Sequence, residues 1–534
     1  MSSPTASARE STRDQRDDRT LATLELLLGD ALGPVALSHF NQITVAISID
    51  ERLPQTSVNR LALETLLNQL TRFIGSVVVM THQASAWRST VHDLLGMIGR
   101  IDPRPGKVVA WATPASLPAS SIHLHLGAQP PSLGSQPLSL AYDGWSARVT
   151  AGLVGRAIIP TTIPFGALAG VCLLVAEVFK RALAMLEVDP TVASAFRGRQ
   201  MDRIGFSALT GDWIPWHEML LQDGMVLPPV PLDRMLLVGG GAVGNAVLWA
   251  LAHGLAWTGS LRVVDPKGIA PPVLNRCLYF DADDLELGKA QTLARKVAPF
   301  PVQPITRDVV AEDIGYLVIS TVDNNAARHI IQEALPAYLI EGATNGTQVS
   351  VSRHTAVNGA ACLICLHPVR SAGLPRTVPL DVASAASHLG LDEATIMSSA
   401  WRGDRGISGE FLAHVAAVAP SATEVFVSAK AAGQDLCGAL GEFRERFGLR
   451  IAPREPALPF VSAFAGFMAA AAAVRHVAAD AGIALPPVHN RLLIDLARRG
   501  IRNPLSRPEG ANPSCPFCQA RQSLVRHLFA SRWS

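Results

Sequence analysis

The chain has 534 residues, of which 49% are hydrophobic and 17% charged, and its formal net charge is +2. This length indicates two or three domains, and the apolar share allows large cores, which excludes a wholly disordered chain. A charge balance so close to neutral gives no electrostatic footprint for nucleic acid. No nucleic-acid partner is therefore expected.

Residues Met1–Thr20 contain almost no large apolar side chains and mix Arg, Asp, Glu and Ser. They predict a disordered tail. The tail lacks the apolar segment of a secretory signal, and its acidic residues argue against a transit peptide. The chain also has an odd number of cysteines, seven. These features favour a reducing compartment, and the expected localisation is cytoplasmic.

The segment Ala157–Ala176 carries no charge, and its 20 residues are enough for a membrane span. Pro160 and Pro164 interrupt its first third, so a helix starting near Pro164 has only about three turns before Glu177. The favoured interpretation is a buried core helix, and no membrane partner is expected. A membrane span is the alternative.

Residues 21–230 alternate predicted strands and helices in a βαβ order but contain no glycine-rich phosphate loop. The predicted strands are Val45–Ile49, Ser76–Met80 and Lys107–Ala112, with an amphipathic helix at Asn59–Phe73 and a Pro/Gly/Ser-rich loop at Gly127–Pro137. This pattern predicts an N-terminal α/β domain.

A Pro-rich linker, Val226–Leu232, precedes a second α/β region. A strand is predicted at Arg234–Val238, followed by a glycine loop and an apolar helix to about Trp257. Further strands are predicted at Leu261–Asp265 and Tyr316–Thr321. This order is typical of a doubly wound parallel sheet of the Rossmann type.

A weak internal similarity links the two regions. The segment PFGALAGVCLLVAEVFK from Pro164 and the segment PFVSAFAGFMAAAAAVRH from Pro459 both begin Pro-Phe, carry Ala-Gly soon after and continue as apolar helices. Two Ala-rich helices can match by chance. Alternatively, the N-terminal half is a decayed copy of the C-terminal half.

Gly239, Gly241 and Gly244 form a GxGxxG pattern between a predicted strand and a predicted helix. Glycines allow a tight turn and close approach of phosphate to the backbone, and the helix N-terminus offers N–H groups. Asp265 ends the next strand, where a carboxylate can hold ribose hydroxyls. The pattern predicts nucleotide binding but does not separate NAD from ATP.

A polar set follows the loop in sequence. Asn275 and Arg276 are adjacent, Lys289 comes later, and Asp323 lies just past a strand end, with Arg328 after it. Adenylation needs cations to neutralise departing pyrophosphate and a carboxylate to hold magnesium. A nicotinamide oxidoreductase has no need of this set. Each cation taken alone could equally be a solvated surface group.

With GGGAVG and the strand-ending Asp265, the motifs LNRCLYF, LGKA, TVDN, LIEGATNG and ACLIC follow in the order of the ThiF/MoeB/ubiquitin-activating superfamily, which the chain resembles. The resemblance implies a Rossmann-like adenylation domain using ATP and Mg²⁺. It implies that Arg276 and Lys289 contact the ATP phosphates, Asp323 binds Mg²⁺ and Asn275 helps to place the nucleotide. Cys277 departs from the family, which usually has Gln at this position.

The resemblance is strong over about residues 234–366 and resumes near 459–478 and 512–519. The N-terminal half is only loosely similar, as in ubiquitin-activating enzymes whose first adenylation half is inactive. Such halves work in pairs, which implies a pseudo-dimer within the chain and allows a homodimer. The expected division is a tail (1–20), a degenerate domain (21–230), the nucleotide-binding part (231–366), an inserted helical crossover (367–458) and a C-terminal part (459–534).

Four cysteines form two CxxC pairs, Cys362 with Cys365 and Cys515 with Cys518. Two such pairs can close a tetrahedral four-thiolate shell around Zn²⁺. Family members with these pairs use zinc to hold the C-terminal tail on the domain, so a structural zinc site is expected. Independent redox-active or buried pairs are the alternative. Cys172 lies in the apolar helix and is expected in the core.

Cys437 lies in the predicted crossover, where ubiquitin-activating enzymes carry their thioester cysteine. A thiolate there could capture the acyl group of an acyl-adenylate. No nearby base or cation marks it, so a buried helix residue is the alternative.

The leading hypothesis is a bacterial type of ubiquitin-like-protein activating enzyme. It would adenylate the C-terminal glycine of its substrate, form a thioester and pass the protein to a conjugating enzyme. The second hypothesis is an adenylyltransferase for a sulfur-carrier protein or a peptide, without an enzyme thioester. An oxidoreductase and a catalytically dead scaffold are the remaining classes, and the polar set argues against both.

Overall fold

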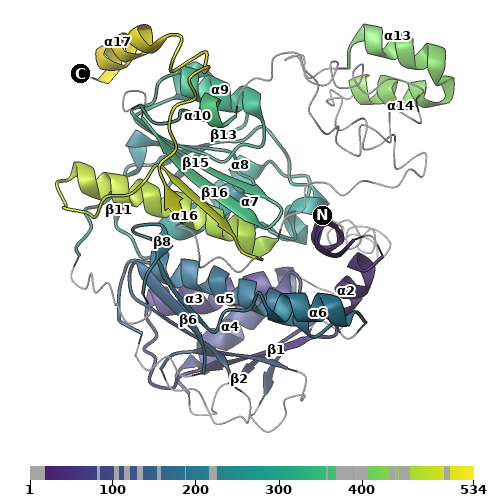
Figure 1. The fold of residues 1–534 in the computed structure, drawn as a ribbon, viewed down its shortest axis with the longest axis vertical. Helices are drawn as coiled ribbons and strands as arrows, with labels where there is room; N and C mark the ends of the chain where they lie inside the picture. The colour runs from purple at the N-terminus through teal and green to yellow at the C-terminus, as the bar shows by residue number, and fades with distance from the viewer. Residues whose placement is uncertain are drawn as a thin grey trace. The chain divides into compact units, whose positions relative to one another are not determined.

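The structure is a computed structural model (Figure 1). The chain divides into two compact units, one comprising Met1–His367 with Glu455–Ser534 and the other Pro368–Arg454. Most of the predicted tail lies outside the described residues, but Arg19 and Thr20 already belong to a helix. The structure describes residues 19–533 except 30, 81–84, 102–107, 113–120, 129–135, 153–157, 187, 216–224, 356–358, 368–388, 390–406, 432–438, 440–442, 444–457 and 498–504.

The first sheet of the larger unit has eight strands in the order β3-β2-β1-β4-β5-β6-β7-β8. The strands from β3 to β5 are parallel and the others antiparallel to their neighbours. The strands are β1 Thr44–Ile49, β2 Ser76–Met80, β3 Val108–Ala112, β4 Ile122–Leu126, β5 Leu138–Tyr142, β6 Ser146–Ala151, β7 Arg203–Ser207 and β8 Asp212–Trp213. The helices are α2 Gly33–Phe40, α3 Ser57–Thr71, α4 Trp87–Ile101, α5 Phe165–Ala184 and α6 Pro190–Arg197.

The second sheet also has eight strands, in the order β13-β12-β10-β14-β15-β16-β17-β18. Its strands are β10 Met235–Val238, β12 Leu261–Val264, β13 Val302–Ile305, β14 Leu317–Ser320, β15 Tyr338–Asn345, β16 Gln348–His354, β17 Arg491–Asp495 and β18 Ser506–Arg507. Its helices are α7 Ala242–Leu251, α8 Lys289–Lys296, α9 Asn325–Glu333, α10 Leu363–Leu366, α16 Pro459–Asp480 and α17 Gln522–Trp533, with 3₁₀ turns at Leu232–Arg234, Pro271–Val273, Ala282–Asp284 and Ala311–Asp313. The predicted α/β class is confirmed.

The two sheets have the same strand order and the same pattern of parallel and antiparallel neighbours. Helix α5 follows β6 and precedes β7, just as α16 follows β16 and precedes β17. These are the two helices that share the Pro-Phe and Ala-Gly pattern in the sequence. The internal similarity therefore marks topologically equivalent helices.

The two halves share one hydrophobic core. Helix α16 packs against both α7 and α5, as Figure 1 shows. The Phe460 ring lies 6.0 Å from that of Phe73 and 5.7 Å from that of Phe179. The Trp249 indole donates a hydrogen bond of 2.8 Å to the Thr65 hydroxyl. Because burying one large apolar side chain contributes about 1.5–3 kcal/mol, this shared core ties the sheets firmly together.

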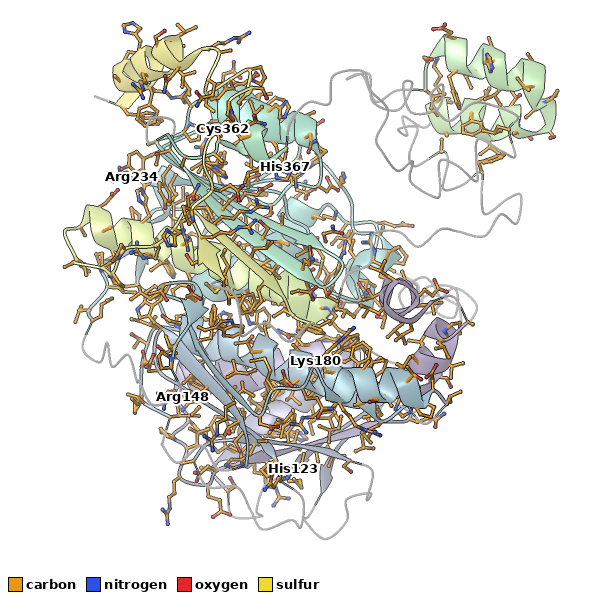
Figure 2. All side chains as sticks on the ribbon, viewed as in Figure 1. His123, Arg148, Lys180, Arg234, Cys362 and His367 are labelled. Carbon is orange, nitrogen blue, oxygen red and sulfur yellow. The ribbon has the colours of Figure 1, made fainter. Side chains whose placement is uncertain are left out.

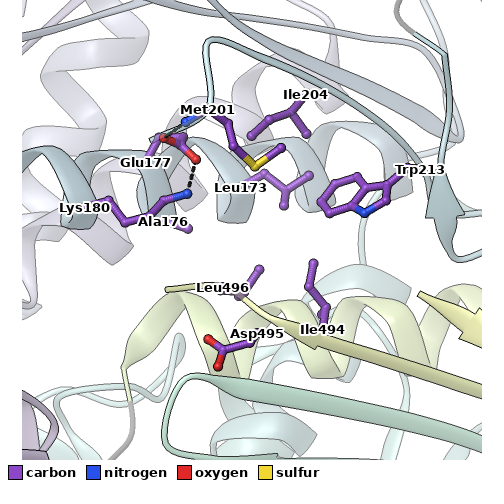
Figure 3. A pocket seen from close by; sticks show the side chains of 10 residues that line it. All are labelled: Leu173, Ala176, Glu177, Lys180, Met201, Ile204, Trp213, Ile494, Asp495 and Leu496. Carbon is purple, nitrogen blue, oxygen red and sulfur yellow. Dashed lines mark hydrogen bonds and ion pairs between the residues drawn. The ribbon is translucent and has the colours of Figure 1, made fainter. Parts of the chain in front are cut away.

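Figure 3 shows a small cavity in this joint, of about 10 Å³, enough for roughly one water. A buried ion pair on α5, Lys180 with Glu177, lies beside it. Glu177 also accepts from the Met201 backbone N–H at 3.0 Å, and Lys180 donates to the Arg199 carbonyl at 3.2 Å. Burial raises the pKa of Glu177. The cavity is too small for a ligand, and the pair serves the joint.

The uncharged segment before Glu177 forms the first part of α5, and every residue of this helix except Arg181 is buried. The predicted core helix is confirmed. Among the helices of the described residues, one, α16, is long and apolar enough to cross a membrane, and 83% of its apolar window is buried inside the protein.

The predicted helix after the glycine loop is too long, because α7 ends at Leu251. Gly254 has a φ of +77°, and a Cβ there would lie 2.3 Å from the Thr162 carbonyl oxygen, so the chain turns at this residue. Trp257 instead begins the short strand β11, Trp257–Thr258. This strand pairs with β9, Val230–Pro231, inside the predicted linker.

The smaller unit contains helices α13, Gly409–Val418, and α14, Pro420–Ala431. Their apolar faces form a separate core, in which Phe411 and Phe426 meet edge to face at 5.2 Å. Cys437 belongs to this unit by sequence and lies outside the described residues.

Candidate functional site

The glycine loop joins β10 to α7 at the carboxyl end of β10. Gly239 has a φ of +101°, and a Cβ on Gly244 would lie 1.9 Å from the Gly239 carbonyl oxygen. A Cβ on Gly241 would meet nothing within 4 Å, so the space beside this residue is open. Gly241 is also the N-cap of α7, with no side-chain cap on the first turn. The first N–H groups of α7 therefore face a space that a phosphate can fill.

Asn245 shapes this loop from inside the fold and is not among the predicted site residues. It is fully buried, and its amide nitrogen donates to the carbonyls of Gly240 at 2.9 Å and Gly241 at 3.0 Å. Because C=O and N–H point in opposite directions across a trans peptide, this turns the following N–H groups away from Asn245. An amide within an otherwise apolar helix start is the sequence signal that could have identified it.

The loop allows a direct test with two alanine substitutions. Gly241→Ala is expected to keep the melting temperature of the wild type but to weaken ATP binding at least about tenfold, because its methyl group enters the open space. Gly244→Ala is expected to destabilise the fold, because its Cβ meets a carbonyl at 1.9 Å. Calorimetric ATP titration and thermal melting measure the two effects.

Gly510→Ala is the matched control, since a Cβ there also meets nothing within 4 Å and lies outside the loop. Wild-type ATP affinity in Gly241→Ala would contradict this assignment of the phosphate position.

Asp265 and Lys289 are held beside the loop by backbone contacts. The Asp265 carboxylate accepts from the Gly240 N–H at 2.7 Å and from the Lys267 N–H at 2.8 Å. Lys289 is the first residue of α8, and its N–H donates to the Lys267 carbonyl at 3.1 Å. The structure thus brings both predicted residues to the carboxyl edge of the sheet. Their roles toward ribose and phosphate stay predictions.

Asp323 follows β14. It contacts Lys267, which also binds Asp265 and Lys289, and the Lys267 ammonium nitrogen lies 3.0 Å from an Asp323 carboxylate oxygen. Partial burial raises the pKa of Asp323, but the Lys267 charge and hydrogen bond and the Asn324 amide outweigh this effect and hold the pKa below its usual range. Asp323 is therefore a carboxylate at neutral pH, as a magnesium ligand must be.

Asn275 is 1% exposed, and neither its amide nitrogen nor its amide oxygen has a hydrogen-bond partner among the described residues. An unpaired buried amide costs about 1–3 kcal/mol. The orphaned amide fits the predicted contact with a nucleotide. Asn275 is thus a predicted site residue whose side chain still lacks the hydrogen-bond partners that a ligand would supply.

The thiol of Cys277 is fully buried, and the positive charges of Arg276 and Lys289 affect its pKa. Burial raises the pKa of this thiol, and the charges of these two residues, then of Arg72 and Arg19, oppose the rise. Cys277 is thus a core residue and not an accessible nucleophile. The N-terminal half reaches this neighbourhood through Arg72, which donates to the Leu274 and Leu278 carbonyls.

Arg72 is 1% exposed and fixed by the neighbouring backbone. Its guanidinium donates to the Leu274 carbonyl, to the Leu278 carbonyl at 3.5 Å, and to the Asn68 side chain at 2.9 Å. Arg72 therefore supports the segment that carries Asn275. Arg19 lies in the first described helix of the chain.

The N-terminal half has a different turn at the position equivalent to the glycine loop. Asp50 follows β1 as Gly239 follows β10, and Gly127 follows β4 as Thr321 follows β14. Asp50 accepts from the Ala128 N–H at 3.1 Å, and a Cβ on Gly127 would lie 2.2 Å from the Asp50 Cβ. A carboxylate thus stands where the C-terminal half has a phosphate loop, and it would repel a phosphate.

A buried polar network runs behind Asp323. Glu341 on β15 accepts from Arg328 at 2.7 Å and contacts His367 at 2.9 Å. Burial raises the Glu341 pKa, but the His367 hydrogen bond and the Arg328 charge lower it to about 2. Arg328 also donates to the Val322 carbonyl at 2.8 Å, one residue before Asp323. The network therefore links the turn of Asp323 to the chain beyond Cys365.

The four predicted zinc ligands come together, with their sulfur atoms within 4.8 Å of one another. The Cys362 sulfur lies 3.6 Å from that of Cys365 and 3.7 Å from that of Cys515, and the Cys365 and Cys518 sulfurs are 3.4 Å apart. Tetrahedral Zn–S bonds of about 2.3 Å imply sulfur separations of about 3.8 Å, so the residues fit zinc. Cys362 and His367 are labelled in Figure 2.

This cluster fastens the C-terminal residues to the domain. The hydrogen bond from Cys362 lowers the pKa of Cys365 against the effect of burial. Farther along, the Trp533 indole donates to the Leu335 carbonyl at 2.7 Å.

Cys172, by contrast, lies in the core as predicted, and burial raises its pKa.

The fold and this site define a nucleotide-binding α/β protein with a phosphate loop at the carboxyl edge of a parallel sheet. Residues 232–517, more than half of the chain, match the ThiF family, and the chain belongs to that family. Membership supports adenylyltransferase activity. ThiF adenylyltransferases use ATP with Mg²⁺. It confirms the resemblance from which the roles of Arg276, Lys289 and Asp323 were predicted.

The chain is 25% identical over 500 residues to "Uncharacterized protein y4jF" of Sinorhizobium fredii (strain NBRC 101917 / NGR234), covering 88% of each chain. This similarity therefore extends into the N-terminal half. Among solved structures, Escherichia coli MccB with MccA-N7isoASN is 14% identical, with a TM-score of 0.33, over 54% of this chain and 67% of that one. MccB alone has a TM-score of 0.32 at 14% identity, over 54% and 65%.

Proposed function

We propose that this protein uses ATP to adenylate the C-terminal glycine of a ubiquitin-like protein, carries the product as a thioester on Cys437 and passes it to a conjugating enzyme. Adenylation rests on one observation: the glycine loop, Lys289 and Asp323 meet at the carboxyl edge of the second sheet. We place the protein in the cytoplasm, because an odd number of cysteines, seven, suits a reducing compartment.

The site residues account for the first step. The substrate carboxylate attacks the α-phosphorus of ATP, and the bond to the β-phosphate oxygen breaks, giving an acyl-adenylate and pyrophosphate. The first turn of α7 holds a phosphate, while Lys289 and Arg276 stabilise the negative charge that gathers on the leaving pyrophosphate. Mg²⁺ held by Asp323 would neutralise and orient the phosphates. The Asn275 amide helps to place the nucleotide in the site.

The N-terminal half is proposed to be an inactive adenylation-like domain that completes the active one. Its strand order supports a common origin, and Asp50 in place of a glycine loop supports the loss of ATP binding.

Thioester formation is tested with the cognate small protein, ATP and Mg²⁺ on a non-reducing gel. An adduct that thiol reductant removes is expected in the wild type. Cys437→Ala is expected to lose the adduct and keep ATP–pyrophosphate exchange, because adenylation precedes attack by the thiol. Cys172→Ala, at a buried core position, is the matched control and keeps the adduct.

An adduct that persists in Cys437→Ala would move the thioester to another cysteine. Adenylation without any adduct in the wild type would instead favour the alternative, an adenylyltransferase for a sulfur-carrier protein or a peptide. That enzyme would release its acyl-adenylate to an external nucleophile.

A further inference from the structure

The side chain of Lys267 lies at the centre of the site, and the adenylation step proposed above gives it no role. It lies two residues beyond Asp265, past the end of β12. Its backbone N–H donates to Asp265 at 2.8 Å, and its carbonyl accepts from the N–H of Lys289 at 3.1 Å. The backbone of Lys267 is thus fixed between two predicted site residues, and its side chain is directed at a third, Asp323.

The Lys267 ammonium lies 3.0 Å from the Asp323 carboxylate, and the two side chains are 50% and 66% exposed. Exposed ion pairs are worth about 0–1 kcal/mol, so this contact is easily exchanged. It differs from the neighbouring pair of Arg328 with Glu341, whose side chains are only 10% and 2% exposed. The Lys267 pair is therefore suited to a contact that breaks during function.

A lysine ammonium and a magnesium ion both bind a carboxylate, and Asp323 cannot hold both at full strength. A lysine side chain has a flexible four-carbon stem and three donors, so its ammonium can move by several ångströms without backbone change. A displaced ammonium can pair instead with the phosphates of a nucleotide at the glycine loop, since Gly240 of this loop and Lys267 both donate to Asp265.

We propose that Lys267 is a nucleotide-contacting residue whose ammonium pairs with Asp323 in the resting enzyme and passes to the ATP phosphates when Mg²⁺ takes Asp323. The site then carries three cations from the active half, Lys267, Arg276 and Lys289. Lys267 has two opposite effects: it competes with metal at Asp323, and it attracts the nucleotide. This proposal rests on the proposed ATP site.

Two binding measurements on Lys267→Gln separate these effects without an activity assay. ATP binding at saturating Mg²⁺, measured by calorimetry, is expected to weaken about tenfold, because a charge contact to phosphate is lost. Mn²⁺ binding without nucleotide, measured by electron paramagnetic resonance, is expected to tighten, because Asp323 loses its competitor. Lys267→Arg keeps the charge and is expected to retain most of the ATP affinity at saturating Mg²⁺.

Arg295→Gln is the matched control. Arg295 is also an exposed cation in an ion pair, 2.8 Å from the buried carboxylate of Asp284, and lies on the last turn of α8. It is expected to leave both affinities unchanged. If wild type binds ATP and Lys267→Gln binds it equally well at saturating Mg²⁺, the role of Lys267 is refuted while the proposed function stands. If wild type does not bind ATP even with Mg²⁺, both fail.

Discussion

Lys289→Ala and Asp323→Ala are each expected to lower ATP–pyrophosphate exchange at least about 100-fold, because each removes a charge that stabilises the departing pyrophosphate mainly in the transition state. The assay follows labelled pyrophosphate into ATP in the presence of the cognate small protein. Asp323 is 66% exposed, so its replacement is not expected to disturb folding. Lys289 is 8% exposed, and thermal melting must accompany its measurement.

Two surface variants serve as controls for this experiment. Arg295→Ala removes an exposed cation from the same helix as Lys289, and Asp308→Ala removes an exposed carboxylate that precedes β14. Both are expected to exchange at the wild-type rate. Undiminished exchange in Lys289→Ala and Asp323→Ala would overturn the active-site assignment, and with it the proposed adenylation.

Freshly purified protein is expected to hold about one zinc ion per chain, and Cys362→Ser or Cys518→Ser is expected to lose it. The loss should destabilise the fold by on the order of several kcal/mol and lower the melting temperature by roughly 10 °C, because the free energy of metal binding is part of the free energy of folding. Elemental analysis and thermal melting measure the two effects.

Cys172→Ala is the matched control for zinc, because it also removes a buried thiol but one remote in sequence from both CxxC pairs. It is expected to keep the full metal content. Zinc-free wild-type protein, prepared without chelators, would refute the zinc site and leave the four thiols as a packed cluster.

The parallel strands of both sheets could be located from sequence where β-branched runs lie between turns, as in TVAISI at β1 and LRVV at β12. The later strands of the first sheet could not. LSLAY at β5 is buried at every position, so its short Leu-Ser-Leu alternation does not separate a buried face from an exposed one. The equal topology of the halves emerged only from the structure.

The glycine loop was predictable because its pattern is local, and the structure shows why Gly239 and Gly244 need to be glycine. Lys267 was not predictable, because its partner Asp323 is 56 residues away, and neither was the contact of Asn245 with Tyr279, 34 residues away. Long-range contacts leave no periodic trace in a single sequence. Arg19 and Arg72 stayed unassigned for the same reason.

The two sheets belong to one chain and share one core, which has a kinetic consequence. Two separate subunits would part on dilution, and a site completed by both would then disappear. Linkage makes their meeting intramolecular, with an effective concentration that does not depend on the amount of protein in the cell. The specific activity of this protein is therefore expected to be independent of its concentration. Each half is also free to change its residues without imposing the same change on the other.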